Sequence, residues 1–251
     1  MLIGLTGSQG FIGSHLYKRL IESGHKVITV QHNELDSFEG ADVIFNLMAY
    51  GNMANHTGDD EIFNANIVKL YQMLNKKYNS FINFSTSAIQ LKNQTLYSAT
   101  KAAGEKLVEY YGGINLRPAS IFGNGEAPFR FIPTIIRSLK NDSMLNLDPK
   151  PSHDWMYILD FIDGVMAVYE HRDKLKGRTI NISTGIEISN KDIVTMLEEI
   201  SGKKAFVNFS ENQRSWDSEH WTVDNSILKL LGWKQKHSLR EGLKETYEQS
   251  G

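Results

Sequence analysis

The sequence contains no cysteine, and this absence excludes disulfide bonds, thiolate metal sites and cysteine nucleophiles. It also has only five prolines, no apolar run of membrane-spanning length and a formal net charge of -2 at pH 7. Such a charge gives no reason to expect nucleic acid or an anionic membrane as a partner. Among the eight histidines, His15, His25 and His32 do not fall at metal-ligand spacings, and His153 forms only a single pair with Asp154. The N-terminus enters a strand pattern instead of a signal peptide. We therefore expect a cytoplasmic protein without a metal ion.

Glycines follow the first apolar run of the chain at a spacing that is typical of dinucleotide sites. The run Leu2–Thr6 ends in Gly7-Ser-Gln-Gly10-Phe-Ile-Gly13, and a helical pattern begins at once. Gly7 suits a tight turn, Gly10 permits close approach of a pyrophosphate, and Gly13 lets the helix pack on the strand. The free N–H groups at the helix start would face the phosphates. The alternative is a βα turn without a ligand, but the strand–turn–helix context favours dinucleotide binding.

The first half of the chain alternates strands with helices, which predicts βαβ units and a doubly wound parallel α/β sheet. We predict strands at Leu2–Thr6, Lys26–Val30, Asp42–Leu47, Phe81–Ser85 and Ile114–Arg117, and helices at Phe11–Glu22, Asp59–Lys77 and Tyr97–Tyr111. After residue 120 the pattern changes, with an irregular polar stretch at 141–153 and a strand at Thr179–Ser183. We predict a dinucleotide-binding domain at 1–122, to which 158–183 returns, and a smaller α/β substrate-binding domain at 123–251.

The residues after the second predicted strand bear on the choice between NAD and NADP. An acidic residue there normally binds both ribose hydroxyls and selects NAD, but this chain has the neutral Gln31 followed by His32. His32 can pair with a 2′-phosphate or can be an ordinary loop residue. Asp36 is a candidate for the adenine amino group. We predict NADP or NAD, with a preference for NADP.

A serine-rich strand end and a Tyr-x-x-x-Lys segment supply candidate catalytic groups. Tyr97 and Lys101 lie four residues apart, on one face of the predicted helix, and Ser87 precedes them at the ligand edge of the sheet. A nearby ammonium lowers the pKa of a phenol, so Tyr97 can exchange a proton with a substrate hydroxyl or carbonyl. Ser87 would hydrogen-bond the same substrate oxygen, and Lys101 can also hold the nicotinamide ribose.

An ordered set of motifs resembles the extended short-chain dehydrogenases/reductases, in particular their nucleotide-sugar epimerase, dehydratase and reductase group. The set spans nearly the whole chain. Its members are Thr6–Gly13, Ala41–Ala49, Asn64–Ile67, Phe84–Ala88, Tyr97 with Lys101, Leu116–Pro118 with Phe122–Gly123, His153–Asp160, Asn181–Gly185 and Leu231–Trp233.

The resemblance implies a Rossmann domain followed by a nucleotide-sugar domain, with Ser87, Tyr97 and Lys101 as the catalytic trio. It also implies cofactor contacts from the glycine turn, the loop after the third strand and the end of the fourth. These contacts are Gly7, Ser8, Gln9, Gly10, Phe11, Ile12, Gly13, Leu47, Met48, Ala49 and Ser85. Relatives often form homodimers through the helices that correspond to Asp59–Lys77 and Tyr97–Tyr111.

Departures from the family pattern limit the substrate and the reaction. Dehydratases carry an acidic pair directly after the catalytic hydroxyl, where this chain has Ala88 and Ile89, so a 4,6-dehydratase is rejected. The segment between Ser87 and Tyr97 is short. His153 replaces an arginine that contacts the substrate diphosphate in relatives, and Arg214 is the candidate replacement. Tyr50 can contact substrate or serve as an ordinary loop residue.

Three functions follow from this pattern. The first is a nucleotide-sugar oxidoreductase that reduces a 4-keto-sugar, with Tyr97 as general acid. The second is a nucleotide-sugar 4-epimerase with tightly bound NAD, which requires the same catalytic trio. The third is a non-catalytic cofactor sensor, which the presence of both Tyr97 and Lys101 disfavours.

Overall fold

The computed structural model describes residues 1–30, 38, 40–52, 56, 58–209 and 220–250, and the chain forms two compact units. The first comprises Met1–Pro118, Ile162–Ile182 and Ser226–Trp233, and the second comprises Ala119–Phe161, Ser183–Asn225 and Lys234–Gly251. Residues 226–233 thus fall in the first unit, although the sequence pattern assigns them to the substrate-binding part.

The first unit is built on a six-stranded sheet with the order β2-β1-β3-β4-β5-β9. Every neighbouring pair is parallel, which confirms the predicted fold class. The strand order reverses between β1 and β3, and doubly wound sheets bind ligands at the carboxyl ends of strands beside such a reversal. The strands are β1 (Leu2–Thr6), β2 (Lys26–Val30), β3 (Val43–Asn46), β4 (Ser80–Phe84), β5 (Ile114–Pro118) and β9 (Thr179–Ile182).

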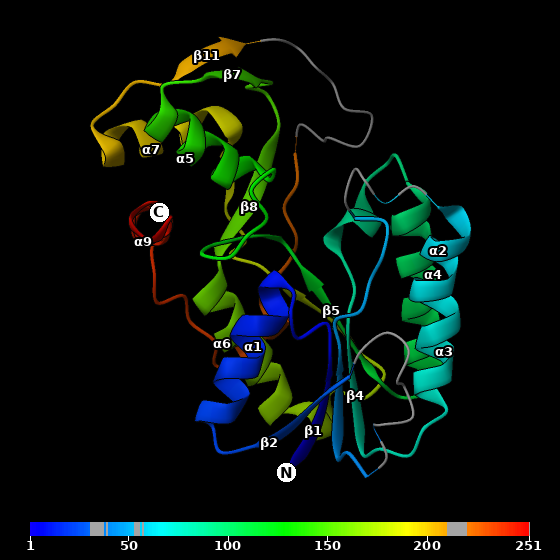
Figure 1. The fold of residues 1–251 in the computed structure, drawn as a ribbon. Coiled ribbons are helices and arrows are strands. Elements are labelled where there is room, and N and C mark those ends of the chain that lie inside the picture. The colour runs from blue at the N-terminus through cyan, green and yellow to red at the C-terminus, as the bar shows by residue number, and fades with distance from the viewer. Residues whose placement is uncertain (31–37, 39, 53–55, 57, 210–219, 251) are drawn as a thin grey trace. The chain divides into compact units, whose positions relative to one another are not determined.

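Helices cover both faces of this sheet, with α2, α3 and α4 on one face and α1 and α6 on the other (Figure 1). Their bounds are α1 (Phe11–Glu22), α2 (Asp59–Phe63), the π-helix η2 (Asn64–Val68), α3 (Lys69–Leu74), the 3-10 helix η3 (Ser87–Gln90), α4 (Leu96–Tyr110), α6 (Ile158–Glu170), the 3-10 helix η4 (Arg172–Lys174) and α8 (Ser226–Leu230). The single helix predicted at Asp59–Lys77 is therefore three segments, with a π-helix in the middle.

A hydrophobic cluster joins the sheet to the helices on the α3/α4 face. Leu70, Met73 and Leu74 of the α3 segment pack with Val108 of α4 against sheet residues that include Phe81. α4 begins in a capping box, in which Thr95 and Ser98 bond each other's backbone N–H groups. The cap fixes where the helix starts, and the cluster fixes the face that it turns toward the sheet.

Within its described residues, the second unit contains a three-stranded sheet, a two-stranded sheet and three long helices. Its larger sheet has the order β10-β8-β6, and β11 pairs with β7. Its elements are β6 (Ser120–Phe122), α5 (Phe131–Asn141), β7 (Met144–Leu147), β8 (Ser152–Tyr157), β10 (Glu187–Ser189), α7 (Asn190–Ser201), β11 (Phe206–Phe209) and α9 (Leu239–Gln249). In Figure 1, α5 lies beside α7. None of the helices among the described residues of either unit is long and apolar enough to span a membrane.

The irregular stretch predicted at 141–153 is wrong, because β7 and the start of β8 lie within it. Both are short strands whose partners are distant in sequence, so local periodicity gives little signal for them. β7 does alternate exposed and buried residues, with Leu145 and Leu147 buried. Pairing with β6, β10 and β11 therefore determines these strands more than local propensity does.

Candidate functional site

The glycine turn connects β1 directly to α1, and its glycine positions leave little room for a Cβ atom. Gly7 adopts φ = +66°, which favours glycine, and its carbonyl accepts a hydrogen bond from the Gly10 N–H at 3.0 Å. A Cβ on Gly13 would lie 2.0 Å from the Gly7 carbonyl oxygen. The first turn of α1 therefore rests on the backbone of the glycine turn itself.

The start of α1 can hold an anionic group. The residue before the helix is Gly10, which has no side chain to cap it, and the first turn carries no acidic residue. The leading N–H groups of a helix have no partner within the helix and lie at the positive end of its dipole. This arrangement fits a diphosphate.

The loop after β3 lies against the same turn. The Thr6 Oγ1 atom accepts hydrogen bonds from the backbone N–H groups of Leu47 and Met48, at 2.9 and 3.0 Å. A Cβ on Gly7 would lie 3.2 Å from the backbone carbon of Leu47. The structure thus brings the predicted cofactor residues of the turn and the loop together beside the strand reversal. These residues are Gly7, Ser8, Gln9, Gly10, Phe11, Ile12, Gly13, Leu47, Met48 and Ala49.

Hydroxyl residues follow β4, the strand next to β3 in the sheet. Ser87 begins η3 and is buried, and the Thr86 hydroxyl caps this short helix by accepting from the Ala88 N–H at 3.1 Å. The Ser85 Oγ atom is buried, and it has no hydrogen-bond partner within the described part of the chain. A buried hydroxyl in this state is costly, so Ser85 suits a polar ligand atom.

Lys101 brings its ammonium group to the same strand end. Its Nζ atom donates to the carbonyl oxygen of Phe84 at 2.5 Å, and the residue is only 4% exposed. Burial lowers the pKa of Lys101 to about 8, and the nearby Glu105 carboxylate opposes that shift. Tyr97 lies one turn before Lys101 on α4 and is half-buried. A cation one helical turn from a phenol favours the phenolate form that proton transfer needs.

Asn66 was not given a role by the sequence pattern, although it stabilises this region. Its Oδ1 accepts from the Tyr50 N–H at 3.1 Å, and its Nδ2 donates to the Tyr50 carbonyl at 2.9 Å. The same Nδ2 donates to Thr100 Oγ1 at 3.0 Å. Asn66 therefore joins the loop after β3 to α4, and the motif Asn64–Ile67 of the family resemblance is the sequence signal that could have found it.

Tyr50 itself stacks on His56, with ring centroids 3.9 Å apart and planes at 11°. The Gly51 N–H donates to His56 Nδ1 at 2.9 Å, and burial lowers the pKa of His56. The imidazole is thus held as a neutral acceptor. Tyr50 belongs to the first unit, in the same loop as Leu47 and Met48.

His153 lies on β8 in the second unit, among aromatic rings. Its ring centroid is 5.1 Å from Trp155 and 5.1 Å from Trp221, and its Nδ1 lies 3.4 Å from Ser120 Oγ. Burial lowers the pKa of His153 to about 4, so the side chain carries no charge at pH 7. A neutral imidazole offers a phosphate one hydrogen bond at most, whereas a guanidinium can form two parallel ones. Arg214, Gln31, His32 and Asp36 lie outside the described residues.

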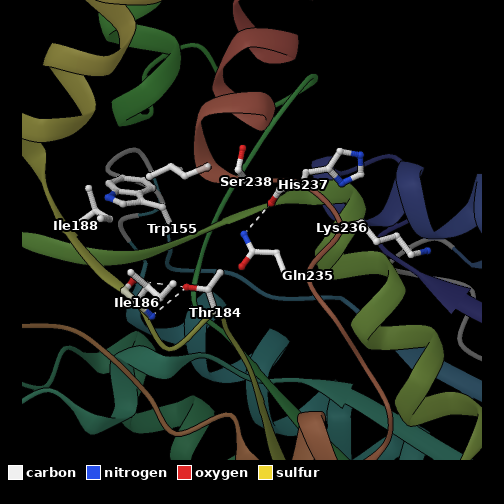
Figure 2. A pocket seen from close by; sticks show the side chains of 9 residues that line it. Trp155, Thr184, Ile186, Ile188, Gln235, Lys236, His237 and Ser238 are labelled. Carbon is white, nitrogen blue, oxygen red and sulfur yellow. Dashed lines mark hydrogen bonds between the residues drawn. The ribbon is translucent and has the colours of Figure 1, made fainter.

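The second unit also contains an open pocket of about 350 Å³, shown in Figure 2. Isoleucines and a tryptophan form one part of its wall, and polar groups before α9 form another. The lining residues are Trp155, Thr184, Ile186, Ile188, Gln235, Lys236, His237, Ser238 and Leu239. None of the predicted site residues that the structure describes lines this pocket.

The model of the NAD dependent epimerase/dehydratase family matches residues 3–183, which cover the glycine turn, the serine-rich strand end and the Tyr97–Lys101 segment. The chain belongs to that family. The resemblance inferred from the motifs is thereby confirmed, and the members of the NAD dependent epimerase/dehydratase family are nucleotide-sugar enzymes that depend on a nicotinamide cofactor.

Two relatives match this chain over nearly its full length and nearly the full length of their own. The chain is 26% identical to the uncharacterized UDP-glucose epimerase YtcB of Bacillus subtilis, with 97% of this chain and 96% of that protein covered. It is 22% identical to the CDP-abequose synthase of Salmonella typhimurium, with 96% and 95% covered. Among solved structures, UDP-glucuronic acid 4-epimerase from Bacillus cereus in complex with UDP-glucuronic acid and NAD has a TM-score of 0.90. Its sequence is 26% identical, and the match covers 99% of this chain and 98% of that one.

Proposed function

We propose that the protein is an NAD-dependent 4-epimerase of a UDP-linked sugar. The observation that carries this proposal is the full-length likeness to the Bacillus cereus UDP-glucuronic acid 4-epimerase, which was solved with UDP-glucuronic acid and NAD. The buried Lys101 amine at the end of β4, one turn from Tyr97, supports the same chemistry. A dehydratase is disfavoured because Ala88 and Ile89 follow Ser87 where an acid and a base would be needed.

NAD is the proposed cofactor, with its diphosphate at the start of α1. The cramped backbone of Gly7 and Gly13, the uncapped helix start and the unpaired Ser85 Oγ all fit a dinucleotide. When bound, NAD supplies a hydride acceptor and donor at the sugar carbon. The preference for NADP that Gln31 suggests has no support from the relatives, whose structures contain NAD.

The side chains would act on the proton at the sugar hydroxyl. Tyr97, as phenolate, accepts that proton as the C–H bond at the same carbon breaks, and it returns the proton when that bond re-forms on the opposite face. The Lys101 ammonium stabilises the phenolate, and Ser87 donates a hydrogen bond to the same sugar oxygen. Tyr97 and Lys101 also hold the nicotinamide ribose in this proposal.

Substrate contacts are proposed at Tyr50, Ser87, His153 and Arg214. Since His153 is neutral, the charge that binds the diphosphate is assigned to Arg214, on the sequence alone. The compartment is proposed to be the cytoplasm, since the chain has no cysteine.

A homodimer is proposed through the α2–α4 face of the first unit. Phe63, Tyr71 and Tyr110 are 51%, 50% and 84% exposed on these helices, although aromatic rings are usually buried. A second copy of the chain would cover them. Sedimentation of the wild type against Tyr110→Glu tests this, because a charge in the interface shifts a dimer toward the monomer.

A keto-sugar reductase is the second candidate, favoured by the neutral Gln31 and by reductase activity in the name of a trifunctional relative from Arabidopsis thaliana. One experiment separates the candidates: native mass spectrometry of the purified protein, followed by incubation with UDP-glucuronic acid or UDP-glucose without added cofactor. Retained NAD and formation of the 4-epimer support the epimerase. Oxidation of NADPH or NADH only in the presence of a 4-keto-sugar supports the reductase. Bound NAD without conversion of any of these sugars supports the sensor.

A further inference from the structure

Three neighbouring strands of the central sheet carry a buried asparagine at the same level. Asn46 on β3 is directly opposite Asn83 on β4, and Asn83 is directly opposite Asn115 on β5. All three are at most 2% exposed. Asparagine is depleted in strands, and burying its amide is costly unless every polar atom finds a partner. An apolar residue would serve backbone pairing equally well, so these amides need a separate explanation.

The side chains form one continuous chain of hydrogen bonds, which we name the asparagine ladder and define as Thr6, Asn46, Asn83 and Asn115. Thr6 Oγ1 donates to Asn46 Oδ1 at 2.9 Å, and Asn46 Nδ2 donates to Asn83 Oδ1 at 3.0 Å. Asn83 Nδ2 donates to Asn115 Oδ1 at 2.9 Å, and Asn115 Nδ2 donates to the Glu105 carbonyl at 3.1 Å. Every bond runs in the same direction across the sheet.

The two ends of the ladder determine that direction. At one end, Thr6 Oγ1 already accepts from the Leu47 and Met48 N–H groups, so its own proton must be donated to Asn46. At the other end, the Glu105 carbonyl can only accept, so Asn115 must present its NH₂ group. Both amides between these ends are then oriented without ambiguity. Hydrogen bonds aligned in this way polarise and strengthen one another.

The ladder joins the two halves of the candidate active site. Its first end holds the loop after β3 against the glycine turn, because Gly7 follows Thr6 directly. Its second end lies on α4 at Glu105, one turn after Lys101. The Glu105 carboxylate in turn accepts hydrogen bonds from Nε and Nη2 of Arg117 on β5, at 2.8 and 2.6 Å.

We propose that the asparagine ladder is a positioning device that holds the cofactor loop and the Lys101 helix in one geometry, with Asn83 as its central positioning residue. Within the described part of the chain, the Asn83 side chain bonds only to other ladder members, so its replacement interrupts the ladder at its centre. The functional part of the proposal rests on the proposed NAD-dependent activity. The physical part, which is the coupling of the loop after β3 to the centre of the sheet, is independent of that activity.

The test compares Asn83→Leu with Ile82→Val, a control at the neighbouring buried position of the same strand. The first readout is hydrogen exchange of the Leu47 and Met48 amides relative to those of β3. The second is NAD affinity and the separate kcat and KM of epimerisation. We expect Asn83→Leu to accelerate exchange at Leu47 and Met48 and to weaken NAD binding by roughly 2- to 30-fold. The control should change neither, although it lowers the melting temperature.

Unchanged exchange and NAD affinity in folded Asn83→Leu would overturn the proposal, as would equal effects in Ile82→Val. If Asn83→Leu does not fold, Asn83→Ser breaks the same links with a smaller side chain and is measured in the same way. A wild type that does not bind NAD would overturn the proposed function instead. In that case the exchange measurement, which needs no cofactor, decides on the ladder alone.

Discussion

Lys101 should make the folded protein more stable as the pH rises above about 8. Its pKa is lowered from 10.5 to about 8 because burial removes water from the ammonium. The folded state therefore binds this proton less tightly than the unfolded state does. Stability rises with pH wherever the unfolded state holds more protons, so Lys101 contributes rising stability between about pH 8 and pH 10.5. Below about pH 8, Lys101 is charged in the folded protein, and its burial then destabilises the fold by the full amount.

The size of the effect follows from the shift in pKa. A difference of 2.5 units between 10.5 and about 8 corresponds to about 3 kcal/mol at 1.36 kcal/mol per unit. Most of it, about 2.5 kcal/mol, is gained between pH 7 and pH 10. No discount for solvent screening is needed, because Lys101 is 4% exposed.

The perturbation is Lys101→Met, which keeps most of the side-chain volume and removes the titrating group. Urea unfolding of the wild type and the variant across pH 7 to pH 10 gives the difference in their free energies of unfolding. Other titrating groups cancel in that difference. We expect the wild type to gain about 2.5 kcal/mol relative to Lys101→Met as the pH rises. A difference that stays constant across this range, or that falls, would refute the inferred burial of a charged amine.

Three further substitutions test the packing around the site. Gly13→Ala should lower stability by about 1–3 kcal/mol and abolish NAD binding, because the new Cβ meets the Gly7 carbonyl oxygen. Thermal melting measures the loss of stability and NAD titration measures binding, and normal NAD affinity in this variant would contradict the expected clash. Glu105→Gln should cost about 3 kcal/mol in urea unfolding, since it breaks a buried ion pair with Arg117, and a loss below 1 kcal/mol would indicate that the pair is not formed. Thr95→Ala removes the cap of α4 and should cost about 1 kcal/mol in the same assay, whereas an unchanged unfolding midpoint would show that the capping box contributes nothing.

The start of the fold could be predicted from the sequence because its signals are local. The bounds of β1, α1 and β2 agree with the predicted ranges residue for residue. Each of these elements is bounded by glycine or by a change of hydrophobic period, which short-range rules describe. β7 and the first part of β8 were missed, because pairing between distant segments determines them.

The site shows the same division between local and non-local information. The spacing of Tyr97 and Lys101 on one helix follows from the period of the helix alone. The asparagine ladder cannot be predicted from such local periodicity, because its links join residues 40, 37 and 32 positions apart. The lowered pKa of His153 likewise depends on burial that a single sequence does not reveal.

Proton exchange between Tyr97 and the sugar is tested by the kcat of Tyr97→Phe beside that of Tyr17→Phe, an exposed tyrosine of α1 with no assigned role, with NAD bound in both variants. Tyr97→Phe should retain NAD and lose at least about 100-fold in kcat, while Tyr17→Phe matches the wild type. Equal kcat values for Tyr97→Phe and the wild type would show that Tyr97 does not exchange this proton.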